Sequence, residues 1–197
     1  MQAVIWADDE KFNCLTGDCL AIVWQRVFDL PSFLQANADI YFNLNEDAFS
    51  IDFSGLSKPV IINSVVNTLA EINCSENVVR INGWNSFLKN NTWEIAGKTD
   101  RVMNDFFKLA GKKIIACNDE AGFISARIIS MIINEAFFAK HDLVSHEQEI
   151  DTAMKLGTNY PYGPFEWVQI IGKENIFNLL IKLSATDKRY QPAPGLH

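Results

Sequence analysis

Residues 149–167 constrain the fold more than any other part of this chain. Four residues in it recur at helical spacing, which predicts a helix that buries one face: Ile150, Ala153, Met154 and Gly157. We expect Gly157 to close this helix as a left-handed cap, because the Tyr-Pro-Tyr-Gly-Pro segment at 160–164 cannot continue it. Pro164 suits the first turn of a following helix. The run therefore predicts a helix, a stop and a second helix.

The first 118 residues alternate short apolar runs with turn-like or helical stretches. Seven of these runs are candidate strands: Ala3–Trp6, Ala21–Gln25, Asp39–Leu44, Val60–Ile62, Val78–Ile81, Trp93–Ala96 and Lys113–Ala116. Runs rich in Val and Ile with few polar interruptions favour strands that are covered on both faces, as in an α/β layer. Asp100–Leu109 carries apolar residues on one side and is predicted to be a helix that stops at Gly111.

Strand signals end at Gly122, and the remaining chain has helical patterns only. A long, heavily apolar helix is expected first, from 122 to about 137, and three more are expected afterwards, over residues 147–156, 164–171 and 173–183. A polar step at Asn118-Asp119-Glu120 separates the two patterns. We therefore predict two domains, an α/β domain over residues 1–118 and a helical domain over residues 119–197.

Charge and composition exclude several classes of function. The chain has 197 residues, 48% hydrophobic and 21% charged, which is typical of a globular protein. The net charge of −7 argues against nucleic acid or an anionic membrane as the main partner. No run approaches the ~18 apolar residues of a membrane span, so we expect a soluble, cytoplasmic protein. The cysteines, Cys14, Cys19, Cys74 and Cys117, lack metal-site spacing, and we expect reduced, mostly buried thiols and no metal.

The run at 149–167 resembles the C-terminal domain of the 3-hydroxyacyl-CoA dehydrogenases, whose pattern is close to D-x-A-M-x-x-G-x-x-x-P-x-G-P-F-E. Residues 118–127 are similar to that family's junction, K-D-x-P-G-F-x-x-N-R. Four positions match, Asp119, Gly122, Phe123 and Arg127, while Ala121 and Ala126 replace the Pro and the Asn. The resemblance implies a reduced Rossmann-like α/β domain followed by a helical domain that pairs to form a homodimer.

The resemblance also implies a chemistry, hydride transfer between a 3-hydroxyacyl-CoA and NAD. The family takes the hydroxyl proton with a histidine, in a segment like G-x-H-F-F-N-P, and holds it with a glutamate, in a segment like K-L-V-E-V. Ungapped comparison places Glu94 at the family's Glu, Asn85 at its Asn and Asn82 at its catalytic His. Asparagine cannot cycle a proton near pH 7, so the base is expected to be lost at Asn82.

The substrate and cofactor segments depart from the family as well. The family's S-N-T-S-S-L, which contacts substrate, corresponds to a stretch that keeps Asn63 and has Ser64 at the Thr position, with valines after it. A dinucleotide site needs G-x-G-x-x-G after the first strand, but residues 7–12 read Ala-Asp-Asp-Glu-Lys-Phe. These carboxylates would repel a pyrophosphate. We therefore expect no cofactor in the family's usual mode.

Three interpretations remain open from the sequence. The first is a catalytically degraded relative that keeps an acyl-CoA site in the cleft between its halves, lined by four residues and braced by a fifth: Asn63, Ser64, Asn85, Glu94 and Arg127. The second is an active NAD-dependent 3-hydroxyacyl-CoA dehydrogenase of fatty-acid metabolism, with water or Glu94 as the base. The third is a non-catalytic interaction module that dimerises through the helical domain.

Overall fold

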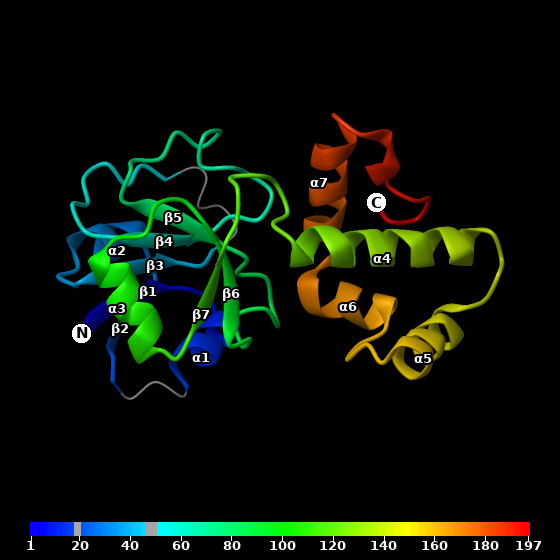
Figure 1. Cartoon of the computed structure of the whole chain (residues 1–197), viewed down its shortest axis with the longest axis horizontal. Coiled ribbons are helices and arrows are strands. Elements are labelled where there is room, and N and C mark those ends of the chain that lie inside the picture. The colour runs from blue at the N-terminus through cyan, green and yellow to red at the C-terminus, as the bar shows by residue number, and fades with distance from the viewer. Residues whose placement is uncertain (18–20, 46–50) are drawn as a thin grey trace. The chain divides into compact units, whose positions relative to one another are not determined.

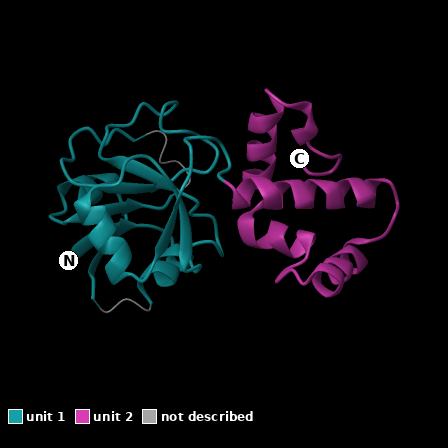
Figure 2. Cartoon of the chain, in the orientation of Figure 1, with its two compact units in different colours: residues 1–123 teal, residues 124–197 magenta. Residues whose placement is uncertain are grey.

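The computed structural model describes residues 1–17, 21–45 and 51–197. They form two compact units, Met1–Phe123 and Ile124–His197, which Figure 2 colours separately and which are described one at a time below. The domain boundary predicted after residue 118 stays a prediction.

Unit 1 is built on a seven-stranded sheet (Figure 1). Its strands are β1 (Gln2–Trp6), β2 (Val23–Val27), β3 (Ile40–Asn43), β4 (Val60–Asn63), β5 (Val78–Ile81), β6 (Thr92–Ala96) and β7 (Lys113–Ala116). Their order across the sheet is β2-β1-β3-β4-β5-β6-β7. Neighbouring strands are parallel except β5 and β6, which are antiparallel. The reduced Rossmann-like fold predicted from the sequence is confirmed.

All seven predicted strands are present, and most boundaries differ by a residue or two. The central strands β3, β4 and β5 are buried along their whole length, as continuous apolar runs predict. The expectation that every strand is covered on both faces is wrong for β7. Its Ile115 side chain is 44% exposed, because β7 is the last strand of the sheet.

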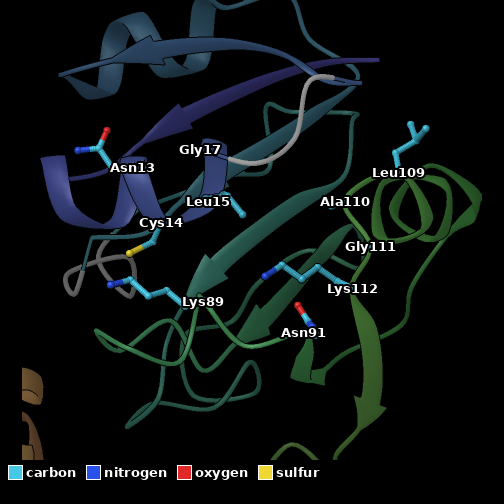
Figure 3. A pocket seen from close by; sticks show the side chains of 10 residues that line it. All are labelled: Asn13, Cys14, Leu15, Gly17, Lys89, Asn91, Leu109, Ala110, Gly111 and Lys112. Carbon is cyan, nitrogen blue, oxygen red and sulfur yellow. The ribbon is translucent and has the colours of Figure 1, made fainter.

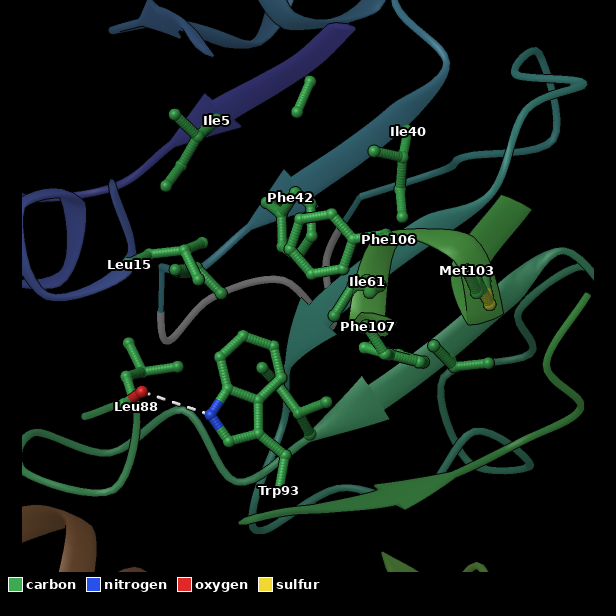
Figure 4. Close-up of a cluster of buried hydrophobic side chains, with 14 of the residues drawn as sticks. Ile5, Leu15, Ile40, Phe42, Ile61, Leu88, Trp93, Met103, Phe106 and Phe107 are labelled. Carbon is green, nitrogen blue, oxygen red and sulfur yellow. Dashed lines mark hydrogen bonds between the residues drawn. The ribbon is translucent and has the colours of Figure 1, made fainter. Parts of the chain in front are cut away.

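Two hydrophobic clusters lie on opposite faces of the sheet, because successive strand residues point to opposite sides. On one face Ile5 and Phe42 pack with Leu15 of α1 (Asp9–Thr16) and Phe106 of α3 (Arg101–Leu109) (Figure 4). On the other face Val4 and Tyr41, the strand neighbours of Ile5 and Phe42, pack with Phe33 of α2 (Leu30–Gln35). The helix at 101–109 is confirmed, with Gly111 at φ +65° after it.

Unit 2 contains α4 (Ser125–His141), α5 (Glu147–Thr158), α6 (Pro164–Ile171), α7 (Lys173–Ser184) and the 3₁₀ turn η2 (Lys188–Tyr190). The four predicted helices are confirmed, and so is the helical C-terminal domain. Two details of α5 were predicted wrongly. Gly157 lies inside the helix, and Asn159, with φ 57°, is the left-handed cap. The expected buried face is only partly formed: Ile150 and Met154 are half-buried, Ala153 and Gly157 are exposed, and the buried residue of α5 is Asp151.

The core of unit 2 forms where α4 packs on α6 and α7. The rings of Phe137 and Phe165 stack with their centroids 5.0 Å apart. Asn134, which is 2% exposed, donates to the carbonyl of Gln191 and accepts from the backbone N–H of Ala193. These bonds attach the segment after η2 to α4. Within the described part of the chain, no helix has the length and apolarity needed to cross a membrane.

Candidate functional site

Three asparagines end neighbouring parallel strands of unit 1. Asn43 is the last residue of β3, Asn63 is the last residue of β4, and Asn82 follows β5 directly. Their exposed fractions are 0%, 0% and 6%. Parallel strands finish at the same edge of a sheet, and in open α/β sheets ligands bind outside the carboxyl ends of the strands, where the strand order reverses. In this sheet the switch point lies between β1 and β3, so Asn43 at the end of β3 borders it and Asn63 and Asn82 lie one and two strands further on. These three residues are called the asparagine edge.

Asn63 and Asn82 shape the turn that follows β5. The N–H of Gly83 donates to Asn63 Oδ1 at 3.0 Å, and the N–H of Trp84 donates to Asn82 Oδ1 at 3.4 Å. A Cβ at Gly83 would lie 2.8 Å from Asn63 Oδ1, so a glycine is needed for this approach. Both amide side chains therefore hold the backbone of Gly83 and Trp84 at the edge where a ligand would be recognised.

Ser64 supports the segment after β4. Its hydroxyl donates to the carbonyl of Asn67 at 2.7 Å, while its own carbonyl accepts from Arg80 Nη1 at 3.0 Å. The side chain is 6% exposed. In this geometry Ser64 holds a turn, which is the ordinary role of a serine after a strand.

Asn85 reaches α1 from the loop after β5. Its Nδ2 donates to Glu10 Oε2 at 2.9 Å, which joins that loop to the first turn of the helix. The sequence identified Asn85 as a site residue but not Glu10 as its partner. Nothing in the sequence connects the two, because they are 75 residues apart.

The N-terminus of α1 is capped by its own acidic residues. Asp8 accepts from the N–H of Lys11 at 2.8 Å, and the Lys11 ammonium lies 3.3 Å from the other Asp8 oxygen. Arg26 of β2 pairs with Asp9 at 2.6 Å and donates to the carbonyl of Ala7. The position where a Rossmann fold usually receives phosphate is thus negatively charged and bonded to side chains of this chain.

Glu94 lies in β6, beside the end of β5. The antiparallel register pairs Arg80 with Ala96 and Ile81 with Ile95, so one residue further on Glu94 is level with Asn82. Burial raises the pKa of the Cys117 thiol, and the Glu94 carboxylate raises it further. The structure thus brings Glu94 to the same edge of unit 1 as Asn63, Ser64, Asn82 and Asn85.

An ion pair between Arg80 of β5 and Asp119 lies close to the asparagine edge. The sequence did not indicate that these two residues pair. Arg80 is 0% exposed, and its Nε donates to Asp119 Oδ1 at 2.6 Å. Asp119 also accepts from the N–H groups of Leu69 and Ala70. Burial acts to raise the pKa of Asp119, but the Leu69 N–H, the Arg80 guanidinium and the Ala70 N–H together hold it below its usual range. Arg80 further donates to the Glu120 carbonyl at 2.6 Å.

Arg127, the remaining predicted site residue, belongs to unit 2. It lies on α4 with its guanidinium carbon 5.8 Å from the centre of the Tyr190 ring. With Ile128, Met131, Arg189 and other residues of α4 and η2 it lines an open cavity of about 580 Å³. Its lining combines apolar side chains with three charged ones, Arg127, Glu135 and Arg189.

Asn43 is the residue of the asparagine edge that the sequence did not identify. Its Oδ1 accepts from the backbone N–H of Asn45 at 3.1 Å and from Asn45 Nδ2 at 2.9 Å. Its Nδ2 is buried and has no hydrogen-bond acceptor among the residues that the structure describes. Buried amides are nearly always paired, so this donor is an exception to the usual pattern. The sequence signal that could have identified Asn43 is its position at the end of an apolar strand.

Among the described residues, no group of three His, Cys, Asp or Glu side chains could hold a metal ion. Cys14, Cys74 and Cys117 form no disulfide, and they are half-buried rather than buried as expected. Burial raises the pKa of the Cys74 thiol to about 11, which makes it a poor nucleophile. Cys19 lies outside the described residues.

The fold places the chain in the class of proteins with a Rossmann-like sheet followed by a helical unit. The (S)-3-hydroxybutyryl-CoA dehydrogenase of Ralstonia eutropha has the same fold, with a TM-score of 0.69 at 17% identity over 99% of this chain and 91% of that one. A 3-hydroxybutyryl-CoA dehydrogenase of Escherichia coli gives a TM-score of 0.70 at 19% identity, over 88% of this chain and 41% of that one.

The sequence of the helical unit is similar to that of known proteins. Residues 122–196 match the model of the 3-hydroxyacyl-CoA dehydrogenase C-terminal domain. The chain is 42% identical over 89 residues to the 3-hydroxyadipyl-CoA dehydrogenase of Escherichia coli, covering 44% of this chain and 19% of that protein. It is 35% identical over 103 residues to the human mitochondrial hydroxyacyl-coenzyme A dehydrogenase, covering 51% and 33%. Over its helical unit the chain is similar to the 3-hydroxyacyl-CoA dehydrogenases, and the resemblance seen in its sequence is confirmed. The matched part spans between a fifth and two fifths of the length of these curated relatives.

Proposed function

We propose that this chain is a catalytically degraded member of its family that binds an acyl-CoA or a related thioester without hydride transfer. The observation that carries the proposal is the start of α1, where Asp8, Asp9 and Glu10 stand in place of a glycine loop. A pyrophosphate at that position would meet three carboxylates, two of them already paired with Lys11 and Arg26, instead of bare backbone N–H groups. The residues present do not suit NAD, and no step of the proposed function uses it.

The loss of a base at the end of β5 supports the same proposal. Ungapped comparison from Glu94 places Asn82 at the family's histidine, whereas counting from Gly83 in G-x-H places Asn85 there. Both positions are asparagine, so the histidine is missing from this segment in either register. An amide has no protonation equilibrium near neutral pH and cannot act as general base.

Binding of a thioester is supported by the polar groups that remain at this edge. Asn43 has a buried N–H group with no acceptor among the described residues, Asn63 ends the adjoining strand β4, and Glu94 lies on β6, on the far side of β5. A carbonyl oxygen is the acceptor that such a donor would select. The expected cleft between the two halves, the bracing role of Arg127 and the cytoplasmic location stay predictions.

The test is calorimetric titration of the whole chain with NADH and, separately, with acetoacetyl-CoA at low salt. We expect binding of the thioester alone, and weaker binding by the Asn43→Ala variant than by a control with Asn104→Ala, an exposed residue of α3. Tight NADH binding together with turnover of a 3-hydroxyacyl-CoA would instead establish the alternative, an active enzyme with water or Glu94 as base.

A non-catalytic dimeric module is the second candidate function, and the surface of α4 favours it. Ile124 and Ile128 lie one turn apart on that helix and are 49% and 53% exposed. Adjacent apolar side chains on one helix face are typical of a protein interface. We expect a homodimer in sedimentation equilibrium that Ile128→Glu dissociates and that Glu135→Gln leaves intact. A monomeric wild-type chain would exclude this candidate.

A further inference from the structure

The turn after β5 contains the one Asn-Gly pair of this chain, Asn82-Gly83. Asparagine is a chemically labile residue, and a following glycine favours its conversion to aspartate most, because no side chain keeps the glycine nitrogen away from the asparagine Cγ atom. Asn82 belongs to the asparagine edge and is 6% exposed. How far this turn reacts therefore depends on how the fold holds the two residues.

The reaction needs only the turn itself and water. The backbone nitrogen of Gly83 loses its proton and attacks Cγ of Asn82, the bond from Cγ to Nδ2 breaks, and ammonia leaves behind a five-membered succinimide ring. Water then opens the ring at either carbonyl, which gives an aspartate or an isoaspartate at position 82. Ammonia has been exchanged for water, and nothing has been oxidised or reduced.

One contact in the turn favours the attack. The N–H of Trp84 donates to Asn82 Oδ1 at 3.4 Å, which is a long hydrogen bond. Negative charge develops on this oxygen during the attack, and a backbone N–H group directed at it stabilises that charge. The folded turn therefore already supplies a donor to the group that is attacked.

A second contact restrains the attacking nitrogen. The N–H of Gly83 donates to Asn63 Oδ1 at 3.0 Å in a buried position. While this bond is made, the plane of the Gly83 peptide group is fixed by Asn63 and cannot turn toward Asn82 Cγ. Loss of the proton would also place a negative nitrogen against the Asn63 oxygen, away from water, which is unfavourable.

Asn63 also explains why position 83 is a glycine. A Cβ at Gly83 would lie 2.8 Å from both Cγ and Oδ1 of Asn63, so a side chain does not fit while Asn63 is in place. Asn63 thus requires the glycine that makes Asn82 reactive, and its own oxygen holds the nitrogen that would react. The reactivity of Asn82 is therefore coupled to one side chain, 20 residues before Gly83.

We propose that Asn82 is a deamidation site and that Asn63 is the positioning residue that suppresses its conversion in the folded protein. Conversion places a carboxylate at a nearly buried position, level with Glu94 on the neighbouring strand. Like charges on paired strands and charges in buried positions both destabilise a fold, so the conversion weakens this edge of unit 1. The inference is independent of the proposed function, because it requires no ligand.

Hydrogen exchange of the wild-type chain is the first test. The Gly83 amide should exchange much more slowly than the amide of the exposed Gly55, because exchange requires the same opening of the Asn63 bond as deamidation does. Exchange at Gly83 as fast as at Gly55 would overturn the proposal.

Peptide mapping by mass spectrometry then measures the conversion of each asparagine at mildly alkaline pH, in the folded chain and in denaturant. In denaturant Asn82 should convert faster than every other asparagine, since it alone precedes a glycine. In the folded chain its conversion should be strongly slowed. Equal rates for Asn82 in the two states would contradict the restraint.

The Asn63→Ala variant, shown to be folded by circular dichroism, should raise the conversion of Asn82 in the folded chain about fivefold, the order expected for one lost hydrogen bond. Asn104→Ala, the same change at an exposed site, should leave it unchanged. Asn13 and Asn91 are exposed internal references, and they line a cavity of about 590 Å³ that no residue of the asparagine edge lines (Figure 3). No rise at Asn82, or an equal rise at Asn13 and Asn91, would overturn the role of Asn63.

Discussion

Each unit of this protein contains a carboxylate that joins segments distant in sequence, and the two carboxylates do so differently. In unit 1, Asp119 accepts from two backbone N–H groups and from Arg80, which is fully buried. In unit 2, Asp151 accepts from the N–H of Phe165 at the start of α6. The bonds of Asp119 include one from a buried cation, whereas the bond of Asp151 comes from the N-terminus of a helix. Both aspartates belong to segments that resemble the dehydrogenase family.

The comparison explains which parts of the family pattern this chain keeps. In the run at 149–167, a Cβ on Gly163 would lie 2.3 Å from the Asp151 carboxylate, and Glu166 caps the N–H of Gly163 at 2.9 Å. Pro164 begins α6, and Lys155 pairs with Glu166. These residues hold a helix junction together. The pattern kept in this run is therefore structural.

The largest loss of stability should come from breaking the ion pair between Arg80 and Asp119 in unit 1. Asp119→Ala leaves the Arg80 charge buried without its partner and should lower the free energy of unfolding by about 3–5 kcal/mol. Glu120→Ala is the control, because the contact with Arg80 uses only its backbone carbonyl, and we expect a change within about 0.5 kcal/mol. Denaturant unfolding, read by hydrogen exchange in unit 1, measures both. A small loss for Asp119→Ala would show that water replaces the carboxylate.

Two glycines of unit 2 should respond with opposite signs. Gly163→Ala forces a methyl group against Asp151 and should cost about 1–3 kcal/mol. Gly157→Ala, inside α5 with open space around the added Cβ, should stabilise by about 0.4–1 kcal/mol. Hydrogen exchange in the helices of unit 2 measures both effects, since the emission of Trp167 overlaps that of the four tryptophans of unit 1. Equal effects in the two variants would refute the close approach at Gly163.

The stability of unit 1 should depend on pH through Asp119. The folded pKa of this group is lowered, so its contribution is complete above the unfolded pKa, about 3.9, and is lost as pH falls through the folded value. Unfolding measured between pH 7 and pH 2.5 should show this loss in the wild type and a flatter profile in Asp119→Asn. Parallel profiles for the two proteins would show that Asp119 does not carry the linkage.

The smallest effect should come from Asp151→Asn, which keeps an acceptor for Phe165 and removes the charge at the N-terminus of α6. Charge near a helix N-terminus contributes about 0.3–1 kcal/mol, and we expect a loss in that range. Asp142→Asn, at an exposed position after α4, should change stability less. A loss for Asp151→Asn as large as that for Asp119→Ala would remove the distinction between the two carboxylates.

Much of the fold could be predicted because its signals are local. Strands such as Val78–Ile81 are short Val- and Ile-rich runs, and Pro164 marks the start of α6 within its own segment. The cap at Asn159 was missed because asparagine and glycine both tolerate a left-handed backbone, and the sequence offered Gly157 first. The exposed edge strand β7 was missed because strand order is not a local property.

The candidate site divides in the same way. The sequence alone identified the acidic turn after β1, the asparagines at 63, 82 and 85, and the family to which the helical unit is related. Only the tertiary structure paired Asn85 with Glu10, placed Glu94 level with Asn82 and left the Asn43 Nδ2 group without an acceptor in the described part of the chain. Residue type and spacing along the chain fix which groups are available. Contacts between residues 20 to 75 positions apart arise only when the strands pair, because register and strand order bring their ends to one edge.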